Sequence, residues 1–198
     1  MKKHFIAIIL MSMLTSPMAL ATGSYGGLSF GQVRLSDDIE IDTGNLGIVL
    51  GGVNEHGLGF ELFYSLTVLD DSNSSGGTDN AWETDTIGLF AVYQSSGEIY
   101  FKAKAGYGMV NLKVDSIDGD TLTTLSDTAE GFGYGLSLGK MFGDGALELT
   151  YYRFADLDGF SDLEQVIEDS LVGSALEGTD VSINSKIEML NLTYVWTF

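Results

Sequence analysis

Four charged side chains stand in segments that otherwise carry apolar, glycine or hydroxyl residues: Glu61, Lys102, Lys104 and Glu148. Two are acidic and two are basic, so they can neutralise one another. Each follows a short predicted turn by a few residues, which puts all four at a similar height if the segments run side by side. Because a buried charge must be paired, we predict an interior ion-pair cluster. Packing and charge cancellation explain it best, and a gate across a narrow pore is the alternative.

The remaining residues offer little for catalysis. The chain has no Cys and two His, of which His4 lies in an N-terminal segment that we expect to be removed, and His56 lies in the predicted turn "NEHG". A hydrolase with a His base therefore has no candidate, and we expect no enzyme. The stretch "DSIDGD" lacks the full spacing and the final Glu of a calcium loop. Solvated acidic surface explains this stretch best, and weak bridging of the acidic loops by Ca²⁺ or Mg²⁺ is the alternative. We assign no metal site and predict no cofactor.

The first 21 residues have the features of a secretory signal peptide. Lys2 and Lys3 supply positive charge, "HFIAIILMSML" is a short apolar run, and "ALA" ending at Ala21 is a small-residue cleavage site. We expect cleavage after Ala21, which leaves residues 22–198 as one domain. Removing the two lysines changes the formal charge from −19 to −21. Such acidity argues against nucleic acid as a partner.

Eight segments of the remaining chain alternate large apolar residues with small or polar ones, which is the period of a β-strand. They cover residues 25–35, 45–52, 58–68, 86–93, 99–111, 131–139, 146–154 and 186–198. Short turns alternate with long acidic connections at about 70–84, 115–127 and 155–185. This layout predicts an even number of antiparallel strands that run up and down.

After the signal segment, no stretch approaches the ~20 apolar residues that a membrane-spanning helix needs. A bilayer otherwise admits only a closed barrel, because every backbone group must be hydrogen-bonded. A soluble lipocalin-like barrel would turn the apolar face inward, but the opposite face of Gly, Ser, Thr and paired charges suits a lumen better. We therefore predict an all-β fold: an eight-stranded antiparallel up-and-down transmembrane β-barrel with short periplasmic turns and long acidic extracellular loops.

Four motifs, "GLGFELFYSL", "EIYFKAKAGYGM", "ALELTYYRF" and the terminal "LTYVWTF", resemble the small OmpA/OmpX-type outer-membrane barrels of Gram-negative bacteria. The resemblance implies an outer-membrane location and assembly by the barrel-assembly machinery. In that family the C-terminal strand is the assembly signal, and the matching positions here are Leu190, Leu192, Tyr194, Trp196 and Phe198. A plain aromatic girdle at the membrane interface is compatible with the same residues.

Three basic residues fall on the predicted lipid-facing parity at the extracellular ends of neighbouring strands: Arg34, Arg153 and Lys186. We hypothesise that they form a patch for the phosphates of lipopolysaccharide, for which Arg offers bidentate geometry. Ordinary rim charge explains them equally well, and Glu188 on the same face weakens the case.

In the last connection, Ser161 and Glu164 form a capping box ahead of helically spaced apolar residues. We predict a short amphipathic helix there, acting as a lid or as a partner-binding element. The function predicted for the whole chain is a non-enzymatic outer-membrane barrel with a structural, envelope or adhesin-like surface role and a plugged lumen. A small passive, porin-like channel is the alternative. The expected partners are outer-membrane lipid, lipopolysaccharide, the assembly machinery, and a host or envelope protein bound through the loops.

Overall fold

The computed structural model describes residues 23–36, 41–69, 71–75, 78–118, 121–158 and 186–198. The strands in these ranges are β1 (Gly23–Ser36), β2 (Ile41–Val53), β3 (Leu58–Leu69), β4 (Asp71–Ser75), β5 (Thr78–Gln94), β6 (Ile99–Asp118), β7 (Thr121–Phe142), β8 (Gly145–Asp158) and β9 (Lys186–Thr197). Within them, no helix is long and apolar enough to cross a bilayer. The predicted signal peptide (1–21) and the predicted helix at Ser161 and Glu164 lie outside the described residues.

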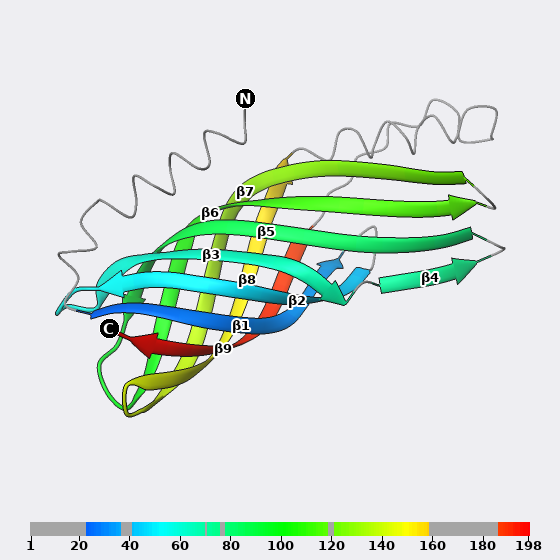
Figure 1. Ribbon diagram of the computed structural model, residues 1–198. Coiled ribbons are helices and arrows are strands. Elements are labelled where there is room, and N and C mark those ends of the chain that lie inside the picture. The colour runs from blue at the N-terminus through cyan, green and yellow to red at the C-terminus, as the bar shows by residue number, and fades with distance from the viewer. Residues whose placement is uncertain (1–22, 37–40, 70, 76–77, 119–120, 159–185) are drawn as a thin grey trace.

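The strands form one antiparallel sheet that closes on itself (Figure 1). Its order is β3-β2-β1-β9-β8-β7-β6-β5-β4, and β3 also pairs with β5. Because β3 and β4 pair with successive parts of β5, they share one position in the wall. The predicted eight-stranded antiparallel barrel is therefore confirmed.

The closing contact joins the first and last strands. Leu28 of β1 lies opposite Tyr194 of β9, and Phe30 lies opposite Leu192. The amide of Phe198 donates a hydrogen bond of 3.0 Å to the carbonyl of Ser24. The end of β9 lies at the same end of the barrel as the tight β2–β3, β5–β6 and β7–β8 turns, which we call the short-turn end.

At the opposite end, two connections that were expected to be loops are β-hairpins instead. The long strands β5, β6 and β7 have 17, 20 and 22 residues, whereas about 9–11 residues cross a bilayer. They project well beyond the rest of the wall together with β4 (Figure 1). The predicted loops 70–84 and 115–127 were wrong because the apolar alternation ends before the hydrogen-bonded ladder does. Pairs such as Trp82 with Val114 continue the ladder between β-prone residues.

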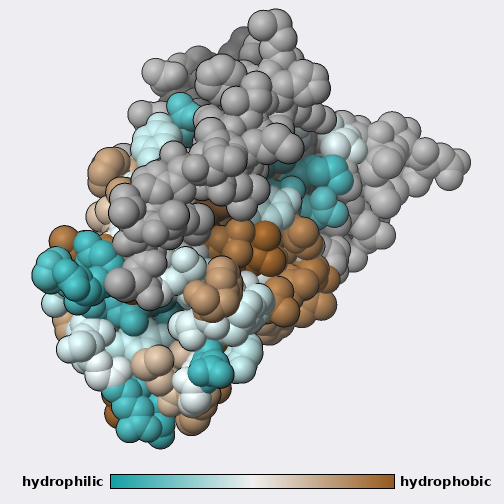
Figure 2. All heavy atoms as spheres, turned by 60° about the vertical axis from the view of Figure 1, so that its left-hand side comes forward, coloured by the Kyte–Doolittle hydropathy of each residue, from teal (hydrophilic) through white to brown (hydrophobic). Residues whose placement is uncertain are grey.

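The outer wall carries the large apolar residues at alternate positions, as predicted. Leu28, Phe30, Leu136 and Leu149 are all exposed. Figure 2 shows hydrophobic side chains, in brown, covering part of the wall, while hydrophilic side chains gather toward the end nearest the viewer. An exposed apolar band around a closed barrel is what a lipid environment accommodates.

The interior contains more aromatic side chains than the glycine, hydroxyl and charged residues of the inward face predict. Phe63, Phe90 and Tyr152 are almost fully buried in it, and glycines make room for such rings. A Cβ atom on Gly51 would lie 2.5 Å from Cζ of Tyr25, and one on Gly135 would lie 2.9 Å from Cδ1 of Tyr152. The small residues of the inward face therefore leave space for large neighbouring side chains. The small and large residues together fill the lumen.

Placing a charge on the outer wall tests the membrane assignment. Leu136 is 60% exposed in the middle of the β7 apolar stripe, whereas Phe142 is 54% exposed next to the β7–β8 turn. We expect Leu136→Arg to lower the free energy of unfolding in phospholipid vesicles by about 2–4 kcal/mol, because the charge is buried in hydrocarbon. Phe142→Arg should cost only about 0–1 kcal/mol, because it reaches the headgroups. Equal losses in urea titrations would contradict a membrane-spanning band.

Candidate functional site

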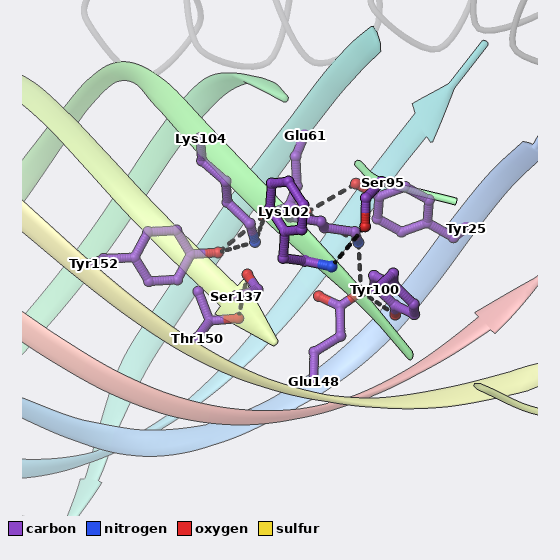
Figure 3. A network of polar contacts seen from close by, with 11 residues as sticks. Tyr25, Glu61, Ser95, Tyr100, Lys102, Lys104, Ser137, Glu148, Thr150 and Tyr152 are labelled. Carbon is purple, nitrogen blue, oxygen red and sulfur yellow. Dashed lines mark hydrogen bonds and ion pairs between the residues drawn. The ribbon is translucent and has the colours of Figure 1, made fainter. Parts of the chain in front are cut away.

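The structure brings the four charges singled out in the sequence into one site, which we call the lumenal cluster: Glu61, Lys102, Lys104 and Glu148. Glu61 projects from β3, both lysines from β6 and Glu148 from β8, all toward the barrel axis (Figure 3). Since β5 separates β3 from β6, and β7 separates β6 from β8, the contacts span the lumen. All four residues are at least 96% buried.

The charges alternate along a chain of ion pairs. Nζ of Lys104 lies 2.5 Å from Oε1 of Glu61. Nζ of Lys102 lies 2.5 Å from Oε1 of Glu148 and 3.9 Å from Oε2 of Glu61. The order Glu148–Lys102–Glu61–Lys104 therefore links three strands, and its formal charges cancel. Both conditions for burying charge, pairing and hydrogen bonding, are met.

Three tyrosines complete the cluster. The hydroxyl of Tyr25 donates to Oε2 of Glu61 at 2.8 Å, and that of Tyr152 donates to Oε1 of Glu61 at 2.9 Å. The hydroxyl of Tyr100 donates to Oε1 of Glu148 at 2.6 Å. These three tyrosines were not predicted as partners of the four charges. The available signal was that each tyrosine lies on the inward parity of its strand, where a buried phenol needs a partner.

The lysines also use the tyrosines. Nζ of Lys104 donates to the hydroxyl of Tyr152 at 2.9 Å. Nζ of Lys102 lies 4.0 Å from the ring centroid of Tyr25, within the range of a cation–π contact. Each ammonium group is thus held by a carboxylate and an aromatic side chain, which fixes both cations in the lumen.

A layer of aromatic rings covers the cluster on the side away from the short-turn end. The ring of Tyr152 stacks on Phe63 with centroids 5.0 Å apart, and Phe90 lies 5.3 Å from Tyr152. Phe154 continues the layer, 6.1 Å from Phe90. An ionic layer and an apolar layer thus lie one above the other in the lumen.

The arrangement suits structure better than catalysis. Its carboxylates and ammonium groups are engaged with one another, and they are removed from solvent. His56 is exposed in the β2–β3 turn, where its Nε2 lies 3.5 Å from Oε1 of Glu55. Within the described ranges, no three His, Cys, Asp or Glu side chains gather so as to hold a metal ion.

The three basic residues assigned to a phosphate patch lie on the neighbouring strands β1, β8 and β9 and project outward. The two arginines have close counterions. Nε of Arg34 lies 2.8 Å from Oδ1 of Asp42, and Nη1 of Arg153 lies 3.7 Å from Oε1 of Glu188. Lys186 lies opposite Ser36 across the β1–β9 pairing. The patch is therefore a mixed row of charges at the end of the wall opposite the short turns.

The predicted assembly-signal residues form the outward face of the last strand. Leu190, Leu192, Tyr194 and Trp196 are exposed at alternate positions of β9, and Phe198 follows them. The rings of Tyr194 and Trp196 lie 6.4 Å apart between centroids. The stripe is an exposed part of the wall, and its role as an assembly signal stays a prediction.

Solved structures with the same fold include Ail, the attachment invasion locus protein of Yersinia pestis, in complex with the heparin analogue sucrose octasulfate. It is 14% identical, with a TM-score of 0.58, and the match covers 89% of this chain and 99% of that one. Neisserial surface protein A is 14% identical with a TM-score of 0.59, covering 90% and 99%. A major outer membrane protein of Thermus thermophilus is 14% identical with a TM-score of 0.57, covering 88% and 99%.

These identities show a shared fold and nothing finer. No curated protein matches the sequence. The model of one protein family, described as the outer membrane protein beta-barrel domain, matches residues 5–169. This match spans most of the chain and agrees with the closed barrel and its apolar outer wall. The chain belongs to the outer membrane protein beta-barrel domain family.

Proposed function

We propose that this protein is a non-enzymatic barrel of the Gram-negative outer membrane that acts in envelope structure or as an adhesin-like surface protein, with a lumen closed to solutes. The observation that carries the proposal is the lumenal cluster. Four paired charges and three tyrosines span the interior from β3 to β8. Contacts through the centre of the barrel hold its strands together, so the barrel can support the segments at its two ends.

The end at which β5, β6 and β7 extend beyond the rest of the wall, which we call the long-strand end, is where this structure differs from a simple barrel. The strands β4 to β7 project there as paired hairpins, and we assign this end to the cell exterior. Ail was solved with the heparin analogue sucrose octasulfate, but the hairpins of the long-strand end carry Asp71, Asp79, Asp115 and Asp118, and this acidity disfavours a polyanion as a ligand there. A partner bound at this end would instead present cationic or neutral groups.

A passive channel is the competing function, and conductance separates the two. We expect the barrel to show no conductance events of porin size in planar bilayers. Lys102→Met combined with Glu148→Gln, which removes one pair without leaving a net charge, should also stay closed, because the rings of Phe63, Phe90 and Tyr152 still fill the lumen. A steady conductance of the unmodified barrel that changes in the double variant would favour a channel gated by the cluster.

The stability of the cluster can be tested with one substitution. Glu61→Gln keeps the volume of the side chain but leaves the Lys104 ammonium buried without its carboxylate. We expect a loss of about 3–5 kcal/mol in the free energy of unfolding, read from urea titrations of the vesicle-bound barrel. Lys113→Met is the control, since it breaks an exposed pair with Glu83 of 3.2 Å and should cost about 0–1 kcal/mol. Similar losses would show that the lumenal pair is solvated and not a plug.

The outer row containing Arg34, Arg153 and Lys186 is proposed as a contact for lipopolysaccharide phosphates. We expect Arg34→Glu with Arg153→Glu to reduce binding to lipopolysaccharide-containing vesicles and to abolish any gain in stability that lipopolysaccharide provides. Lys140→Glu is the control, because Lys140 projects outward near the opposite end, with Nζ 5.3 Å from the ring centroid of Phe142. Unchanged binding in the double variant, or an equal fall in the control, would contradict a lipopolysaccharide contact. The three residues would then be ordinary charges at the rim of the barrel.

A further inference from the structure

The pairing of β1 with β9 closes the barrel. The alternation of outward and inward side chains does not by itself determine the register of this pairing. A slip of two residues keeps every side chain on its original face, because the pattern repeats every two residues. The apolar stripe of β9 is nearly uniform over Leu190, Leu192 and Tyr194, so it discriminates poorly between neighbouring registers. Other residues of the β1–β9 pairing, which we call the seam, must select the observed register.

The middle of the seam contains a contact whose steric fit distinguishes between registers, which we call the steric key. Asn191 of β9 lies opposite Gly31 of β1, and Oδ1 of Asn191 occupies the place that a Cβ atom on Gly31 would take. A slip of two residues would bring Ser29 or Val33 opposite Asn191, and both carry a Cβ. The observed register is thus the one in which the asparagine meets a residue without a side chain.

A gain in stability does not explain why an asparagine is buried at position 191. It is 2% exposed, and its Nδ2 has no hydrogen-bond partner among the residues that the structure describes. An unsatisfied buried amide lowers the free energy of unfolding. A buried polar residue that costs stability yet fits only one alignment is a known way for proteins to specify register.

A second key lies nearer the long-strand end of the seam. Arg34 of β1 lies opposite Glu188 of β9, and Glu188 lies opposite Arg153 of β8 on its other side. A slip of two residues would place Arg34 opposite Lys186, a like charge, or opposite Leu190, an apolar side chain. Charges directly opposite on adjacent strands stabilise when unlike and destabilise when like.

We propose that Asn191 with Gly31, and Glu188 with Arg34, are register keys that select how the last strand closes on the first. The consequence reaches the lumenal cluster. Register fixes the shear of a barrel, and a slip of two residues shifts β1 by roughly 7 Å along β9. A changed shear would alter how β8 lies across the lumen from β3, and with it the hydrogen bond of 2.9 Å that Tyr152 donates to Glu61.

The absence of cysteine from the sequence allows register to be read by disulfide trapping. Phe30→Cys with Leu192→Cys joins direct register partners. Phe30→Cys with Leu190→Cys, and Phe30→Cys with Tyr194→Cys, report the two slipped registers. In the native register these diagonal pairs lie roughly 7–8 Å apart between Cα atoms, beyond the usual reach of a disulfide. Each pair is introduced into residues 22–198, which are refolded into phospholipid vesicles and then oxidised.

With both keys intact we expect only the 30–192 disulfide. Gly31→Val should turn that product from dominant to minor, through slipped disulfides or a lower folded fraction. The exchange variant, Gly31→Asn with Asn191→Gly, should restore part of the native disulfide, since it removes the clash with Oδ1 and leaves the approach of 2.5 Å between a Cβ at position 31 and the carbonyl oxygen of Leu190. Recovery in the exchange variant supports the steric key even where Gly31→Val fails to fold.

Two results would overturn the steric key. One is a Gly31→Val chain that folds and gives the 30–192 disulfide in unchanged yield. The other is an exchange variant that remains as defective as Gly31→Val, which would mean that Gly31 is needed for another reason. Gly23→Val is the control on the same strand, because a Cβ at Gly23 would meet no atom of the described part of the chain within 4 Å, and it should leave the native disulfide unchanged.

The charge key has its own test in the same assay. Glu188→Lys should lower the yield of the 30–192 disulfide and raise that of 30–194, the register in which Arg34 escapes the new lysine by moving opposite Leu190. Glu188→Gln, which removes the attraction without adding repulsion, should have a smaller effect. Identical disulfide yields in Glu188→Lys and the unmodified chain would remove Glu188 from the set of keys.

Discussion

A wall in contact with hydrocarbon leaves no backbone group without a partner, and the rest of this structure depends on that constraint. The ladder runs from β3 through β9 to β5 and returns to β3. Because the wall closes, its inner face becomes a cavity of small diameter that must be filled. Strand closure thus creates the problem that the interior side chains solve.

The interior solves it with two kinds of filling. Near the short-turn end, charges of both signs cross the lumen, and Glu61 is their hub because it accepts from Lys104, Tyr25 and Tyr152. Above them the filling is aromatic. Tyr152 belongs to both layers, since its hydroxyl joins the ion pairs while its ring stacks on Phe63. An amphipathic side chain is what allows a polar layer to meet an apolar one without an unsatisfied group between them.

Much of this was readable from the sequence, because alternation of period two fixes both the strands and the face of each residue. The parity of Glu61, Lys102 and Glu148 was enough to predict that their charges share the lumen. Parity does not give distance along the axis, so it did not show which tyrosines reach which carboxylates. It also fails where both faces of a strand are polar, which is why the hairpin extensions of β5 to β7 were predicted to be loops.

The two faces of the wall also explain where charge is tolerated. Inside, charges lie deep in the barrel because partners from other strands surround them. Outside, Arg34, Arg153 and Glu188 are confined to the end of the apolar stripe and paired sideways along the sheet, since a charge in mid-stripe would face hydrocarbon. The same ion-pair chemistry therefore serves two purposes set by geometry alone. Across the lumen it joins opposite walls, and along the rim it joins neighbouring strands, β1 to β2 and β8 to β9.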